Sequence, residues 1–157
     1  MAIPPELRTL ALSHDGVITI DDARGHGLSG GAISRRVNAG EWVREGAGIY
    51  RLADHPVTGK TRTRLATLQV SAQGILSGLM AAWWHGVVSV RPSSSTVTAP
   101  VGWHGSPVKG AVVVRRTLDP ADVVVTKGLQ VTALPLSVLE GAVEGRMSSI
   151  ARSRTSA

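Results

Sequence analysis

The 157-residue sequence contains no cysteine and no phenylalanine, and its aromatic residues are four Trp and one Tyr. The lack of cysteine excludes disulfides and thiolate metal sites, and it fits a cytoplasmic protein. So few aromatic rings count against a surface that stacks unpaired bases, as many proteins that bind RNA or single-stranded DNA do.

Long apolar runs are also missing from the sequence. No stretch approaches the roughly twenty apolar residues that span a membrane. The N-terminal segment MAIPPELRTL lacks the apolar run of a signal peptide. We therefore expect a cytoplasmic protein that has no membrane partner.

Signatures of catalysis and metal binding are absent as well. The five His are scattered, and no Gly-rich phosphate loop ends in Lys-Ser or Lys-Thr. Asp119, Asp122 and Lys127 resemble part of a nuclease motif, but Val125 stands where a second carboxylate is needed. The sequence therefore predicts no enzyme activity, no metal site and no cofactor.

The net charge of +6 favours an anionic partner, chiefly nucleic acid. This charge is unevenly distributed along the chain. Residues 1–54 contain six Lys and Arg against seven Asp and Glu, whereas residues 55–157 contain eleven against four. The charge alone thus indicates a second contact surface or a basic tail, and not an N-terminal binding site.

The N-terminal third nevertheless carries the clearest pattern. From Ile20 a short helix is expected, because acidic residues such as Asp21 and Asp22 suit the first turn of a helix. Ser29 is a suitable N-cap for a second helix from about Gly30 to Ala39. Two short helices joined by a glycine-containing turn are typical of a helix-turn-helix.

A β-hairpin is predicted directly after the second helix. Residues 41–44 and 49–52 have the composition of strands, and the segment Glu45-Gly46-Ala47-Gly48 supplies the turn. The extended segment 17–19 is expected to pair with this hairpin. The order of elements is that of a winged helix-turn-helix.

Polar side chains on the second helix and the hairpin are the candidate site. Arg bridges guanine and Asn bridges adenine in the major groove, and the start of a helix binds phosphate. Seven residues are predicted to contact DNA: Ser29, Ser34, Arg35, Arg36, Asn38, Arg44 and Arg51. Three more are candidate backbone contacts on a following helix over residues 57–73, namely Lys60, Arg62 and Arg64.

Two other interpretations of this pattern remain open. Helix-turn-helix geometry also occurs in proteins that bind no DNA, and the pair Arg35 and Arg36 is compatible with an ordinary solvated helix face. In the same way, the basic residues of segment 57–73 are compatible with a solvated surface.

Four segments resemble AbiEi-type antitoxins of type IV toxin–antitoxin systems. They are LSGGAISRRVNAGEWVREGAGIYRL, ILSGLMAAWWHGV, STVTAP and VVVRRTLDPADVVVTKGLQVTALPLSVLEGA, and they occur in the family's order. The resemblance implies an N-terminal winged helix that binds operator DNA and represses its own operon. It also implies a nucleotidyltransferase-like toxin as a possible partner.

The sequence therefore predicts an α+β protein. Its expected parts are a winged helix-turn-helix at 1–54, a small mixed α/β antitoxin-like domain at 55–145, and a disordered basic tail at 146–157. We expect a regulator that binds double-stranded operator DNA, with two copies on an inverted repeat. The alternative is a protein–protein interaction module without DNA binding, either antitoxin-like or a truncated relative of proteins that continue into a Vsr-like nuclease domain.

Overall fold

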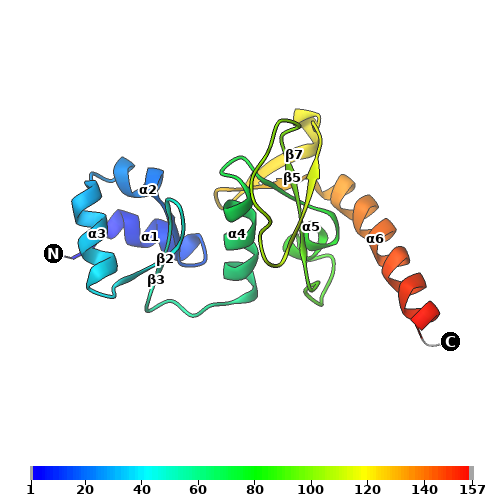
Figure 1. Cartoon of the computed structure of the whole chain (residues 1–157), viewed down its shortest axis with the longest axis horizontal. Coiled ribbons are helices and arrows are strands. Elements are labelled where there is room, and N and C mark those ends of the chain that lie inside the picture. Colours follow the sequence, from blue (N-terminus) through cyan, green and yellow to red (C-terminus); the bar gives the residue numbers. More distant parts are fainter. Residues whose placement is uncertain (1, 156–157) are drawn as a thin grey trace. The chain divides into compact units, whose positions relative to one another are not determined.

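The computed structural model describes residues 2–155, with side chains described through residue 145 (Figure 1). Helices and sheets occur together, which confirms the predicted α+β class. The chain forms two compact units, Met1–Gln69 and Val70–Ala157. No helix in the described part of the chain combines the length and the apolar character needed to cross a bilayer.

The first unit is a winged helix-turn-helix followed by one more helix. Its elements are α1 (Pro5–Ser13), β1 (Val17–Thr19), α2 (Ile20–Gly25), α3 (Gly30–Asn38), β2 (Trp42–Gly46), β3 (Ile49–Leu52) and α4 (Gly59–Val70). The three strands are antiparallel in the order β1-β3-β2, so β1 pairs with the hairpin as predicted.

Local hydrogen bonds fix the ends of the two short helices. The Thr19 hydroxyl accepts from the Asp22 N–H while the Asp22 carboxylate accepts from the Thr19 N–H, which is a capping box at the start of α2. The Ser29 hydroxyl accepts from the Ala32 N–H at the start of α3. Between them Gly27 adopts a φ of +84°, which lets the chain turn sharply.

The two faces of the three-stranded sheet pack against different helices. Alternate strand residues such as Ile18, Trp42 and Tyr50 face α1, α2 and α3 and form the main core with Ile33. The residues between them face the other way. On that second face a smaller cluster joins strand residues Val17 and Ile49 to Leu65 of α4.

Polar contacts also attach α4 to the first unit. The Arg64 Nε lies 3.2 Å from an oxygen of Asp15, in the turn between α1 and β1, and the Thr61 hydroxyl donates to the Asp15 carbonyl. Gln69 donates to the carbonyl of Glu45 in β2. The unit therefore extends to Gln69, and the predicted boundary after residue 54 is wrong, because these contacts come from residues distant in sequence.

The second unit is a five-stranded mixed sheet with two helices. Its elements are β4 (Ile75–Ser77), α5 (Gly78–Trp84), β5 (Ser95–Ala99), β6 (Ala111–Arg115), a 3-10 turn (Pro120–Asp122), β7 (Val123–Thr126), β8 (Leu129–Thr132) and α6 (Leu134–Thr155). The strand order is β6-β5-β4-β8-β7, with β5–β6 and β4–β8 parallel. This is a mixed α/β arrangement, as predicted.

Helix α6 is fixed to this sheet and to α5 by its first turns. Glu140 forms an ion pair with Arg116, and Glu144 accepts hydrogen bonds from the Leu79 N–H and the Thr96 hydroxyl. Position 78 has a φ of +67°, and an added Cβ would collide with Glu144, so glycine is required there.

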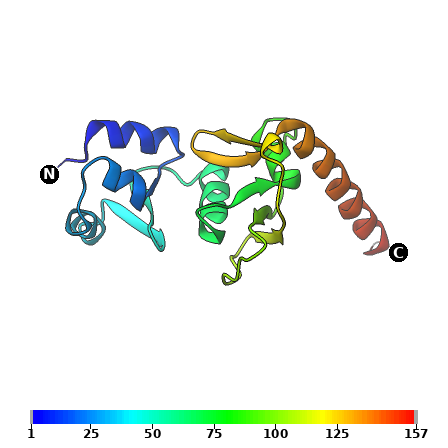
Figure 2. The same cartoon turned by 90° about the horizontal axis from the view of Figure 1, so that it is seen from above.

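The C-terminal helix is longer than the sequence predicted. We expected a disordered tail from residue 146, but α6 runs from Leu134 to Thr155 and projects beyond the sheet of its own unit (Figure 2). The last two residues of the predicted tail lie outside the described residues.

Candidate nucleic-acid interface

The outer face of α3 is polar and fully accessible. Ser34, Arg35 and Asn38 are exposed, as the sequence predicted. Small residues border them, and a hollow of about 330 Å³ lies beside Arg35, lined by Ala32, Arg35, Arg36, Ala39 and Glu41. A polar, rigid helix with a hollow beside its longest exposed side chain is a suitable surface for groups rich in hydrogen-bond donors and acceptors.

The start of α3 offers backbone donors. Ser29 is exposed and its hydroxyl caps the Ala32 N–H at 3.1 Å. The N–H groups of Gly30 and Gly31 make no hydrogen bond within residues 2–155, and no atom lies within 4 Å of a Cβ added at Gly30. Such N–H groups, together with the helix dipole, bind phosphate.

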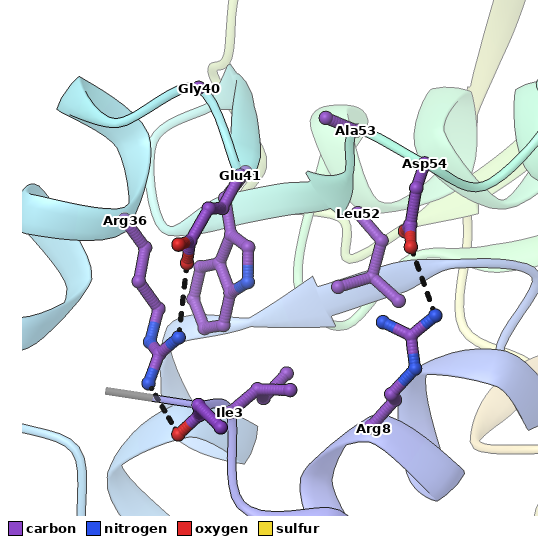
Figure 3. A pocket seen from close by; sticks show the side chains of 10 residues that line it. Ile3, Arg8, Arg36, Gly40, Glu41, Leu52, Ala53 and Asp54 are labelled. Atoms are coloured by element: carbon purple, nitrogen blue, oxygen red, sulfur yellow. Dashed lines mark hydrogen bonds and ion pairs between the residues drawn. The ribbon is translucent and has the colours of Figure 1, made fainter.

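Arg36 contributes to the lining of the hollow beside Arg35, but its side chain is buried and is not presented on the outer face of α3. Only 9% of it is exposed, because it turns inward and packs over the Trp42 ring. Its Nη1 lies 3.2 Å from an oxygen of Glu41, and its Nη2 donates to the Ala2 carbonyl at 3.0 Å (Figure 3). The predicted pair of exposed guanidinium groups is therefore wrong, and α3 presents one.

The inward position of Arg36 places it at the rim of a second hollow, of about 380 Å³. Arg36 and Glu41 line one side of this hollow, and the exposed ion pair of Arg8 with Asp54 lines the other (Figure 3). Trp42 also belongs to the lining. Arg36 thus joins the N-terminal segment, α3 and the start of β2. Its interactions are those of a structural residue that sets how α3 sits on the sheet.

The two arginines predicted on the hairpin lie on opposite faces of the sheet. Arg44 is exposed and pairs in register with Tyr50, on the face that packs against α3. Arg51 pairs with Val43 on the α4 face and is bound to Glu45 at 2.8 Å. A bulge in β2 after Arg44 accompanies this arrangement. Arg44 therefore lies on the α3 side, whereas Arg51 is a structural residue on the other side.

The three basic residues of α4 are on the face opposite to α3. Arg64 is 2% exposed and forms its ion pair with Asp15, so the prediction that it is an accessible backbone contact is wrong. Burial lowers the pKa of Arg64, although the Asp15 carboxylate opposes this effect. Arg62 is exposed and Lys60 is half-buried.

One basic residue was missed in the sequence. Arg24, in the last turn of α2, is exposed and makes no ion pair or hydrogen bond among the described residues. Its signal was available, since the first helix of a helix-turn-helix crosses the nucleic-acid backbone and a cation there is well placed.

Acidic and histidine side chains do not gather into a metal site. Among the described residues no group of three or more His, Asp or Glu is placed to hold an ion. The accessible chemistry of the first unit is thus a helix start with unpaired N–H groups, a polar helix face, and separate guanidinium groups.

Comparison with known families agrees with this geometry. Residues 5–53 match the AbiEi antitoxin family of transcriptional regulators. The matched segment includes α1 to β3 and all seven predicted DNA contacts, and it confirms the predicted resemblance over this stretch. At the level of the family, the matched segment is that of a DNA-binding transcriptional regulator.

Comparisons over the whole chain add little. No curated protein sequence matches it. The solved structure of the RV2827C protein from Mycobacterium tuberculosis is similar at 19% identity and a TM-score of 0.43, over 77% of this chain and 48% of that one. The chain thus spans about half the length of that protein, and a likeness at this level carries no argument about function.

Proposed function

We propose that the protein is a sequence-specific regulator that binds double-stranded DNA and represses its own operon. Helix α3 would enter the major groove with Ser34, Arg35 and Asn38 toward the base edges. The Ser29 hydroxyl and the N–H groups that follow it would bind phosphate, and Arg44 would bind the flanking backbone.

A single observation supports this proposal most strongly. Helix α3 lies within the segment that matches the family, and it has an exposed polar face with unpaired N–H groups at its start. An exposed arginine without an ion pair stays hydrated until an anion takes the place of water, so Arg35 is available to DNA without loss of an internal contact.

Two copies on an inverted repeat are expected, because a helix-turn-helix reads a half-site of a few base pairs. We expect the operator in the region upstream of the protein's own gene. A reporter fused to that region should be repressed by the wild-type chain, and repression should be lost with Arg35→Ala. Unchanged repression by the variant would contradict autorepression through this helix.

The direct test is a fluorescence-anisotropy titration of the full chain on that upstream region. Arg35→Ala should weaken specific binding by about 1–3 kcal/mol, with an unchanged melting temperature because the side chain is exposed. The matched control is Arg115→Ala, an exposed arginine of β6 in the second unit, which should bind as the wild type does. Equal affinities of all three proteins would reject α3 as the reading element.

A second candidate function comes from the second unit. The described part of α6 exposes an apolar stripe at Leu134, Val138, Leu139 and Val143, which are 43–64% exposed. Contiguous exposed apolar residues mark protein interaction sites more often than single ones do. We therefore propose α6 as a surface for a protein partner, for which a nucleotidyltransferase-like toxin encoded beside the gene is the expected candidate.

This second proposal has its own test. Leu139→Glu should abolish co-elution with the purified product of the neighbouring gene while DNA binding stays intact, and exposed Thr9→Ala in α1 is the control. Co-elution that survives Leu139→Glu would exclude this stripe as the contact.

A further inference from the structure

We propose that α3 reads one guanine through Arg35 and one adenine through Asn38, and that these two bases lie one or two base-pair steps apart. This inference rests on the proposed function and adds the base sequence that the site recognises. It follows from the number of accessible reading groups on α3, from their spacing, and from the hollow beside them.

The number of guanines follows from the position of Arg36. The sequence offers two adjacent arginines, and each is able to bridge the O6 and N7 atoms of a guanine. In the structure Arg36 is 9% exposed and is bound to Glu41 and to the Ala2 carbonyl. Only Arg35 remains, so one copy of the chain reads one guanine from this helix.

The spacing follows from helix geometry. Arg35 and Asn38 are three residues apart, which corresponds to about 4.5 Å along a helix axis. Base pairs are stacked about 3.4 Å apart. The Nη1 of Arg35 lies 3.8 Å from the position of a Cβ on Gly31, so the guanidinium extends toward the start of α3 and away from Asn38. The separation of the two groups therefore fits one or two steps.

The chemistry of each group selects its base. The guanidinium donates two parallel hydrogen bonds to guanine, whereas the Asn38 amide accepts from N6 and donates to N7 of adenine. Glu41 lines the hollow beside Arg35 with a carboxylate that is 56% exposed. A carboxylate repels phosphate and accepts from the cytosine N4 amine. The hollow, which Arg35 and Glu41 both line, thus offers a donor for guanine and an acceptor for the paired cytosine.

The test is a selection of binding sites from a randomised duplex library with the full chain. Wild-type sites should contain a guanine and an adenine one or two steps apart in each half-site. Replacement of that guanine by 7-deazaguanine, or of that adenine by 7-deazaadenine, should weaken binding about tenfold, since each removes one of the two bridged atoms.

Variants assign each base to its side chain. Sites selected by Arg35→Ala should lose the guanine and keep the adenine, and sites selected by Asn38→Ala should show the reverse. Arg35→Lys should keep the salt dependence of binding, because the charge remains, but lose the guanine preference, because an ammonium lacks the planar fork. The control Arg115→Ala, in the second unit, should select the wild-type sites.

Three outcomes of the site selections would overturn the inference. They are a guanine preference that survives Arg35→Ala, a requirement for two adjacent guanines, and a guanine and an adenine more than two steps apart. Salt-dependent binding with no preference for either base would overturn the base assignment, but the proposal that the protein binds DNA would stand. The absence of any DNA binding at low salt would overturn both.

Discussion

Arginines on the two faces of the three-stranded sheet differ in exposure and in ion pairing. On the α3 side, Arg35 and Arg44 are exposed and make no ion pair within the described chain. On the α4 side, Arg51 is bound to Glu45 and Arg64 to Asp15. Arg44 and Arg51 lie at adjacent register positions of paired strands. The face on which an arginine lies, and not the residue type, therefore decides whether an outside anion can reach it.

The cause is the cost of burying a charge. A guanidinium removed from water requires a carboxylate or several hydrogen bonds, and α4 covers its face of the sheet closely enough to leave Arg64 2% exposed. Arg35 is exposed on the outer surface of α3 and stays hydrated, so it needs no carboxylate. Arg36 belongs to α3 but is buried, and like buried Arg64 on the α4 side it forms an ion pair, in this case with Glu41.

The largest expected effect is a loss of stability when the buried ion pair on the α4 side is removed. Asp15→Asn removes the carboxylate that faces buried Arg64, and loss of one partner of a buried ion pair costs about 3 kcal/mol. Urea unfolding should show this loss in the free energy of unfolding. The control is Asp54→Asn, which removes an exposed pair with Arg8 and should cost less than about 1 kcal/mol. Equal losses would mean that burial does not distinguish the two sides.

The next prediction compares the two hairpin arginines directly. Arg44→Ala should weaken binding to all DNA sequences and lower the slope of log affinity against log salt by about one, with little change in stability. Arg51→Ala should lower stability, since its ion pair with Glu45 is mostly buried, and should leave the salt slope unchanged. A lower slope in the Arg51 variant would place both arginines against DNA.

A third, smaller effect tests whether phosphate approaches the first turn of α3. Gly31→Ala places a methyl group on the first turn of α3, where the nearest atoms are at an ordinary 3.8 Å. The folded state should gain up to about 1 kcal/mol from helix propensity, whereas DNA binding should weaken because phosphate approaches this turn.

The matched control for this third prediction is Gly145→Ala. That position is also a helical glycine with open space around it, in the second unit. The control should gain stability without any loss of DNA binding. Stronger DNA binding by Gly31→Ala would show that no phosphate comes close to this turn.

Much of the first unit was predictable because its signals are local. Ser29, the glycine before it and the alternation after Trp42 predicted α3 and the hairpin within a residue or two. The same local pattern did not distinguish buried Arg36 from its exposed neighbour Arg35. The signal that decides it is also short-range, since Glu41 and Trp42 follow five and six residues later.

The features that the sequence did not predict depend on contacts between residues far apart in the chain. Arg64 and Asp15 are 49 residues apart, so nothing near Arg64 indicated a carboxylate, and α4 was assigned to the wrong unit. β4 has three residues and was not predicted as a strand, although it is the central strand of the second sheet. A strand that short is defined by its neighbours, which come from β5 and β8.

The smallest expected effect is a pH dependence confined to the α4 side. Burial lowers the pKa of His14 below 6.5, Arg64 lowers it further, and Asp22 and Asp15 act in the opposite direction. The folded state therefore favours the neutral ring, and the unfolded chain takes up the proton first as the pH falls through 6.5. Stability should thus decrease between pH 7 and pH 5, and His14→Gln should decrease less. Thermal melts of both proteins across this range measure the difference, and parallel losses would mean that folding does not lower the pKa of His14.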